Sequence, residues 1–456
     1  MEKISAINNI INGFVWGPYM LVLLIGTGVY MSIRTYFFQV KNFNIWAKLT
    51  YGSMFDKHEK GHNITPFQAV SVALASTIGI GSIAGIATAI VSGGPGALFW
   101  MVVSAFFGMM TKFSEVVLSV YFREKDENGI HYGGPMYYIE KGLKQKWLSI
   151  LFAIFASIAT FGAGNMTQSN AIAGLLNQTL KLPEYVSGII VAIIVALVLI
   201  GGIKRISSVS EKLVPFMATI YFIASIIILI INFKNIPQAI KLIVSEAFSL
   251  KSAASGITGY AIFIAMRYGI ARGVFSNEAG LGTAPIAHTA SNTNNPIKQG
   301  MWGVFEVFNT LIICLLTGLV IISSDLYLYG NTAADGAVLT SLAFKEAIGI
   351  IGEIVITISS ILFAFSTIIG WSYYGETCLG YLTKRNKIVI MSYKIIFIII
   401  IVIGATSDLK SVWAIADTFN GLMAIPNLIG VILLSPIVIT MVKKYIKNPN
   451  SVELEY

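Results

Sequence analysis

The sequence predicts an all-α protein that crosses a membrane many times. Of its 456 residues, 55% are hydrophobic and only 12% are charged, and the mean hydropathy is +0.76. Soluble globular proteins carry about 25% charged residues. Apolar runs of roughly 18 residues or more recur along the chain, and each is long enough for a helix that spans a bilayer.

The alternation of apolar runs with polar breaks predicts eleven transmembrane helices. The first run follows a short polar head with Glu2 and Lys3 and is kept as a span, because it is too long for the core of a signal peptide. The expected spans are 14–32, 66–92, 97–121, 147–180, 185–203, 212–232, 255–290, 300–323, 350–382, 388–405 and 411–443. Four of them exceed the ~20 residues that a perpendicular helix needs, so we expect these to be tilted, broken or extended.

The basic residues predict the orientation of the chain. With the N-terminus outside and the C-terminus cytoplasmic, twenty of the 31 Lys and Arg residues fall in cytoplasmic loops, seven fall outside and four lie within spans. Such a bias is the positive-inside pattern of membrane proteins, and we expect a multi-pass protein of the plasma membrane. The net charge of +9 therefore reflects topology, and a nucleic-acid partner is not expected.

Two spans carry glycine-rich interruptions at corresponding places. The second contains TIGIGSIAG (77–85), and five spans later the seventh contains IARGVFSNEAGLGTAP (270–285). Interrupted segments in corresponding positions of two five-span halves are typical of an inverted-repeat transporter. The expected parts are an extra N-terminal helix with a cytoplasmic loop (1–65), a first repeat (66–232), an extracellular linker helix (233–254), a second repeat (255–443) and a cytoplasmic tail (444–456). A further amphipathic helix is expected at 335–348.

The glycines suggest a binding site within the membrane. Glycine accepts backbone angles that other residues resist, so a cluster can unwind a helix for a few residues. The N–H and C=O groups released in this way are costly against lipid but can bind a zwitterion and a cation. Close helix packing is the alternative for one cluster, since Gly81 and Gly85 form a small-xxx-small pair. Because two such clusters occur at corresponding positions of the two halves, a binding site is favoured over close helix packing.

Several longer motifs resemble the sodium:alanine symporter family. They are GGPGALFWM (93–101), KFSEVVLSVYFR (112–123), GGPMYYIEKGL (133–143) and FSNEAGLGTAPIAH (275–288), and the resemblance covers nearly the whole chain. It implies a leucine-transporter type of fold and sodium-driven uptake of alanine or glycine. One departure is Ser82, where the family commonly has Asn, which weakens the case for an additional sodium site there.

The expected substrate site combines backbone groups with side-chain amides. One side would be formed by the backbone of Gly79, Ile80 and Gly81, and the other by Gly273, Val274, Phe275 and Ser276, with Phe275 closing the pocket. In the fourth span, Asn165, Gln168 and Asn170 are amides at membrane depth that could clamp a zwitterion, and Asn165 and Gln168 are spaced to share a helix face. Hydrogen bonds between helices are the alternative role for each amide.

The expected sodium site rests on adjacent hydroxyls in the ninth span. Ser366 and Thr367 lie in the apolar stretch FAFSTIIGW (363–371). Sodium prefers oxygen ligands, as other hard cations do. Fold analogy pairs these hydroxyls and the carbonyl of Phe363 with the carbonyls of Ala75 and Ile78. The alternative is that both hydroxyls bond back to their own helix.

Other polar groups are given structural roles. We expect Arg267, Arg272 and Glu278, on either side of the second interruption, to pair or to act in gating; Glu278 is the proton carrier to test if protons replace sodium. HEKGH (58–62) matches a zinc pattern, but Gly61 interrupts it and its flanks are polar, so we assign it to a hydrated loop. Cys314 and Cys378 are read as buried small residues.

The sequence thus predicts a symporter for small neutral amino acids, with sodium as the coupling ion and no other cofactor. It would be neither an enzyme nor a primary pump. Three rivals stay open: an ion channel, an intramembrane metalloprotease built on HEKGH, and a cation-coupled symporter of the same fold for another small solute, including a proton-coupled variant.

Overall fold

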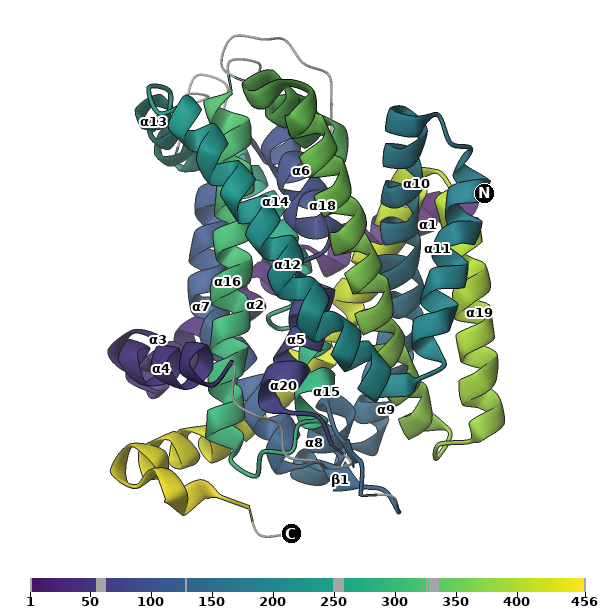
Figure 1. Ribbon diagram of the computed structural model, residues 1–456. Helices are drawn as coiled ribbons and strands as arrows, with labels where there is room; N and C mark the ends of the chain where they lie inside the picture. Colours follow the sequence, from purple (N-terminus) through teal and green to yellow (C-terminus); the bar gives the residue numbers. More distant parts are fainter. Residues whose placement is uncertain are drawn as a thin grey trace.

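The computed structural model is a bundle of helices with one small hairpin (Figure 1). It describes residues 2–54, 63–127, 129–248, 258–324, 327 and 336–454. The helices of the first half are α1 (Glu2–Val15), α2 (Pro18–Arg34), α3 (Phe38–Lys41), α4 (Phe43–Ser53), α5 (Pro66–Thr77), η1 (Ile80–Ser82), α6 (Ala84–Gly93), α7 (Gly96–Tyr121), α8 (Pro135–Leu143), α9 (Lys146–Phe161), η2 (Gly162–Met166), α10 (Thr167–Leu180), α11 (Glu184–Leu199) and α12 (Gly202–Ile231). Those of the second half are α13 (Ile236–Ala247), α14 (Thr258–Asn277), α15 (Ala284–Thr289), α16 (Pro296–Ser323), α18 (Gly336–Leu382), α19 (Lys387–Ala405), α20 (Leu409–Lys447) and η4 (Pro449–Val452).

The helical content and the apolar spans confirm a polytopic membrane protein. Within the described part of the chain, seven helices are long and apolar enough to cross a membrane, and α2, α6 and α11 are shorter apolar helices. In Figure 1, α13 lies at one end of the bundle, while α8, the hairpin and the C-terminus lie at the other. The hairpin pairs β1 (Glu124–Lys125) with β2 (His131–Tyr132) and was not expected from the sequence, since strands this short carry no periodic pattern.

The second expected span is broken where its glycines lie. Thr65 and Gln68 form a capping box at the start of α5, and the helix ends at Thr77. Gly79 is extended, Ile80–Ser82 form a single 3-10 turn, and α6 resumes at Ala84. Every residue from Ile78 to Ser82 is buried in protein. The predicted interruption of this helix is confirmed.

The seventh expected span is also broken, but later than its first glycine suggested. α14 continues through Gly273 and ends at Asn277, and the interruption covers 278–283. Positive φ angles at Glu278 (53°), Gly280 (93°) and Gly282 (79°) turn the chain before α15 begins. Gly273 to Ser276 therefore lie in the last turns of α14, where the carbonyl of Val274 accepts from the N–H of Glu278, and only carbonyls at the end of this helix can be free for a ligand.

The two broken helices lie antiparallel to each other. α15, which follows the second break, packs against α5, which precedes the first; α14 packs against α6 in the same way. Two other helices depart from the expected limits. The fourth span contains the π-helix η2, and the expected helix at 335–348 is the first part of α18, joined to the rest through a kink at Ile348 and Gly349.

A buried ionic cluster joins α7 to the helices around the second break. Lys112 Nζ lies 3.2 Å from Glu306 Oε1, and the second oxygen of Glu306 is 3.0 Å from His288 Nε2. Gln299 contacts His288 Nδ1 at 2.8 Å. All four side chains are fully buried. The pairing of Lys112 with Glu306 agrees with the low tolerance of membrane interiors for isolated charges.

Replacing Lys112 with Met should destabilise the protein, because it leaves Glu306 buried without its cation. We expect the free energy of unfolding in detergent to fall by about 3–5 kcal/mol. Lys141→Met is the matched control, since Lys141 and Glu124 form an ion pair that is largely exposed, and its loss should cost under about 1 kcal/mol. Equal stability of the two variants would show that the buried pair contributes no more than an exposed one.

Candidate functional site

A narrow cavity lies at the first break, where four helices meet. Its wall is formed by residues of α5 and the break, of η2 and α10, of α14 and of α18: Ser76, Thr77, Gly79, Gly81, Ala163, Gln168, Phe275, Thr367 and Trp371. The volume is about 10 Å³, which is room for about one water molecule. The glycines are required here, because a Cβ on Gly79 would lie 2.3 Å from Thr367 Oγ1 and one on Gly81 would lie 2.8 Å from the ring of Phe275.

Oxygen atoms gather beside this cavity, where α5 ends against α18. Ser366 Oγ and Thr367 Oγ1 each donate to the carbonyl of Ala75 at 3.0 Å. Both hydroxyls also contact the carbonyl of Phe363, at 2.8 and 3.0 Å. The structure thus brings together four of the five residues expected to bind sodium, and the hydroxyls bond to their own helix as well as across to the break. Ile78, the fifth, directly follows the end of α5, and neither hydroxyl donates to its carbonyl.

Only one of the three expected amides reaches the cavity. Gln168 Oε1 accepts from the backbone N–H of Ile80 at 3.2 Å, and its Nε2 donates to the carbonyl of Ala163 at 2.9 Å. Asn165 instead donates to Phe397 O of α19 at 2.7 Å. Asn170 donates to Gly404 O and Ser407 O at the end of α19. Hydrogen bonding between helices, the alternative role, therefore describes Asn165 and Asn170 in this structure.

α14 contributes one aromatic side chain to the wall of the cavity. Phe275 lines the cavity. Ser276 Oγ is 2.7 Å from Ser82 Oγ and 3.2 Å from Cys314 Sγ, so it connects the break to α16. Gly273 faces Met101 of α7, and Val274 is packed in the apolar core. Of the four residues expected from this segment, only Phe275 borders the cavity.

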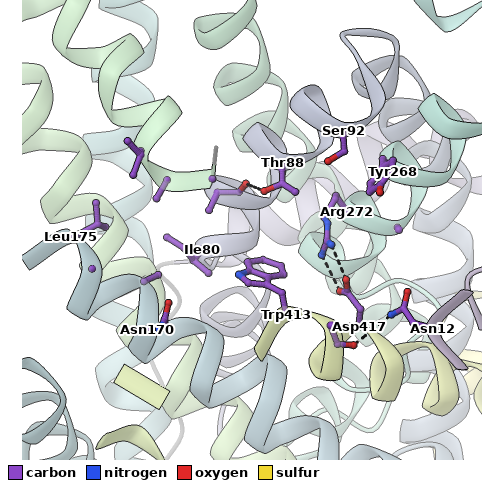
Figure 2. Close-up of a pocket in the computed structure, with 18 of the residues that line it drawn as sticks. Asn12, Ile80, Thr88, Ser92, Asn170, Leu175, Tyr268, Arg272, Trp413 and Asp417 are labelled. Carbon is purple, nitrogen blue, oxygen red and sulfur yellow. Dashed lines mark hydrogen bonds and ion pairs between the residues drawn. The ribbon is translucent and has the colours of Figure 1, made fainter. Parts of the chain in front are cut away.

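A wider vestibule of about 600 Å³ lies above the cavity, toward the end of the bundle that carries α13. Figure 2 shows its floor, where Ile80 and Trp413 lie next to the ion pair of Arg272 with Asp417. The guanidinium binds both carboxylate oxygens, at 2.9 and 2.7 Å. It also lies 4.8 Å from the ring of Trp413, and that ring is 4.9 Å from the ring of Phe275. Trp413 lines the vestibule and Phe275 lines the narrow cavity, so the contact of their rings lies between the two spaces.

The family model described as "Sodium:alanine symporter family" matches residues 1–455.

The chain belongs to this family.

Curated relatives align over almost the whole chain. The sodium/alanine symporter AgcS of Methanococcus maripaludis is 44% identical over 451 residues, covering 98% of both chains. An uncharacterized transporter of Haemophilus influenzae is 42% identical and covers 98% of this chain and 97% of its own. The probable sodium/glutamine symporter GlnT of Bacillus subtilis is 35% identical, with 98% and 92% covered. The family and these relatives are transporters, and the protein is therefore not an enzyme.

No metal centre competes with this assignment in the described part of the chain. Its His, Cys, Asp and Glu residues form no group of three or more that could hold a metal ion. The HEKGH motif (58–62) lies outside the described residues. Glu278 accepts from Thr283 Oγ1 at 2.6 Å within the second break, while Arg272 pairs with Asp417.

Sequence reasoning missed several residues of the site. Trp371 follows Thr367 by one helical turn, and Ser76 and Thr77 precede the first break, so their spacing from residues already chosen could have indicated them. Thr317, which donates to Ser82 O at 2.9 Å, and Asp417 come from distant helices. No local signal connects these two residues to the breaks.

Gly79→Ala should destabilise the break, because its new methyl group collides with Thr367. We expect a loss of about 1–3 kcal/mol in the free energy of unfolding. Gly85→Ala is the matched control: its Cβ meets nothing nearer than Arg272 Cδ at 3.9 Å, so stability should be unchanged or should rise by up to about 1 kcal/mol. If both variants were equally stable, the close approach of Gly79 to α18 would be unsupported.

Proposed function

We propose that the protein imports small neutral amino acids together with sodium. The observation that carries this proposal is the arrangement at the first break. There, the hydroxyls of Ser366 and Thr367 and the carbonyls of Ala75 and Phe363 lie beside a cavity bordered by Gly79 and Gly81. Oxygen ligands suit a hard monovalent cation, and the freed backbone of a broken helix suits a zwitterion. Sodium would be the only cofactor.

The walls of the cavity favour alanine and glycine over larger substrates. Phe275 and Trp371 border a space with room for about one water molecule, so side chains of its wall must withdraw even for alanine or glycine and must withdraw further for a larger substrate. One relative is named for alanine and another for glutamine, so substrate size differs among proteins of similar sequence. A cation-coupled symporter for another small solute, or a proton-coupled variant, is the alternative.

Transport by alternating access is supported by the side chains at the boundary between the cavity and the vestibule. The Phe275–Trp413 contact lies between the vestibule and the cavity, and the Arg272–Asp417 pair lies beside it on the vestibule wall. Separation of these side chains would connect the site to the vestibule. Sodium and substrate drive such a change only to the extent that they bind one conformation more tightly than the other.

The membrane arrangement belongs to the same proposal. The chain would cross the membrane eleven times: one extra helix comes first, and two five-span repeats of opposite orientation follow. Repeats of opposite orientation account for the antiparallel packing of α5 with α15 and of α6 with α14. The distribution of basic residues supports an external N-terminus and a cytoplasmic C-terminus in the plasma membrane.

Uptake into proteoliposomes tests the function directly. Labelled alanine should accumulate with an inward sodium gradient and should not accumulate when potassium replaces sodium. Glycine and serine should compete, and leucine should compete weakly. Accumulation driven by a proton gradient without sodium would favour the alternative, and large sodium currents without stoichiometric uptake would indicate a channel.

Ser366→Ala combined with Thr367→Ala should weaken sodium dependence, because it removes two of the proposed oxygen ligands. We expect the sodium concentration for half-maximal uptake to rise about tenfold or more. Ser359→Ala with Ser360→Ala is the matched control, since it removes adjacent buried hydroxyls from the same helix, two turns away. An unchanged sodium requirement in the first variant would contradict the assignment.

Gly81→Leu should abolish sodium-dependent alanine binding at the first break, because its side chain enters the cavity against Phe275. The control is Gly26→Leu, at a position of α2 with no atom within 4 Å of an added Cβ. Equilibrium binding of labelled alanine in detergent with saturating sodium measures both. Normal affinity in Gly81→Leu would refute the placement of the substrate.

A further inference from the structure

A second cavity lies at the opposite end of the bundle from the vestibule, under the hairpin. Its volume is about 340 Å³. Four parts of the chain form the wall: the hairpin with Asp126 and Tyr132, the first turn of α12, the end of α18, and the turn into α19 with Arg385. Neither the central site nor its ion-binding oxygens contribute to it.

Hydrogen-bond donors without partners face this cavity. α12 is a 30-residue helix whose first turn, Gly202–Lys204, borders the space, and no side chain caps it. The first N–H groups of a helix have no partner within the helix and carry partial positive charge. Tyr373 and Thr377, one turn apart on α18, are 3% exposed, and their hydroxyls make no hydrogen bond to any described residue other than each other.

Charges of both signs surround the cavity. Lys204 and Arg385 are cations on its wall and Asp126 and Glu376 are anions, but Glu376 is already paired with Lys394 at 3.0 Å. Arg385 is held in place by a hydrogen bond to Tyr137 Oη at 3.1 Å and by stacking on the ring of Tyr132. A doubly charged phosphate would meet the carboxylate of Asp126 on the wall, which opposes its binding. A zwitterion can place its carboxylate against the donors of α12 and α18 and its ammonium against Asp126.

We propose that this cavity is a second site for a zwitterionic amino acid, on the side where transported substrate is released. The inference rests on the proposed function for the identity of the ligand, a small amino acid, and for the side on which substrate is released. A molecule bound there touches the hairpin, α12, α18 and the turn into α19 together. Its presence therefore ties these four elements to one another at the end of the protein opposite the vestibule.

Binding to protein whose central site is blocked tests this proposal. Gly81→Leu protein, checked for monodispersity, is titrated with alanine by calorimetry without sodium. One weak site is expected, and Thr377→Val or Tyr373→Phe in the same background should weaken it about tenfold, because each removes a hydrogen-bond donor to a carboxylate. Thr440→Val is the matched control, since Thr440 is exposed on α20 and bonds to its own helix. Wild-type protein in sodium-free medium serves as a second background if Gly81→Leu does not fold.

The comparison ligands separate a zwitterion from a simple anion. Propionate, ethylamine and inorganic phosphate each carry only part of the expected charge pattern and should bind much more weakly than alanine. Equal binding of propionate or phosphate, no alanine binding up to tens of millimolar, or binding insensitive to both hydroxyl variants would each overturn the proposal. Failure of sodium-coupled uptake would leave this equilibrium measurement unchanged, so the two hypotheses fail separately.

Discussion

The structure depends on one requirement: backbone groups released inside the membrane must be paired by neighbouring helices. Lipid offers no hydrogen bonds, and each unpaired group there costs several kcal/mol. At the first break, Ser366 and Thr367 donate to Ala75 O, Gln168 accepts from Ile80 N, and Thr317 donates to Ser82 O. At the second, Asn427 donates to Gly280 O. The partners come from α10, α16, α18 and α20, which places these helices around the two interruptions.

This requirement connects folding to function. Gln168 and Thr367, two of the side chains that complete the first break, also line the cavity. A ligand at the proposed site would therefore exchange contacts with them rather than create an unpaired group. Exchange of one hydrogen bond for another has a small net free energy. The second break is different, because it is part of a fully buried network: Thr283 donates to Glu278 within the break, and Asn427 donates both to Gly280 O and to Glu115.

The sequence predicted the membrane class, the position of the first break and most of the oxygen cluster. Glycine spacing indicated the break directly, and the resemblance to the family supplied the pairing of α18 with α5. The second break was placed too early because Gly273 serves close packing against Met101, while the turn uses Glu278, a residue that rarely adopts positive φ.

The prediction that Asn165 faces the substrate site failed for a different reason. The π-helix Gly162–Met166 inserts an extra residue into the turn, so Asn165 and Gln168 no longer face the same way. The partner of Arg272 is 145 residues away in the chain, and no local pattern in a single sequence connects it to Asp417.

The two cysteines have a practical consequence. Cys314 lies beside Ser276 at the core of the bundle, and Cys378 is enclosed near the end of α18; both are buried and unpaired. Thiol reagents added to intact cells or vesicles should find little native background. Single cysteines introduced at exposed loop positions can thus be modified in the otherwise unaltered chain, and the side of the membrane on which each one reacts maps the orientation of the protein.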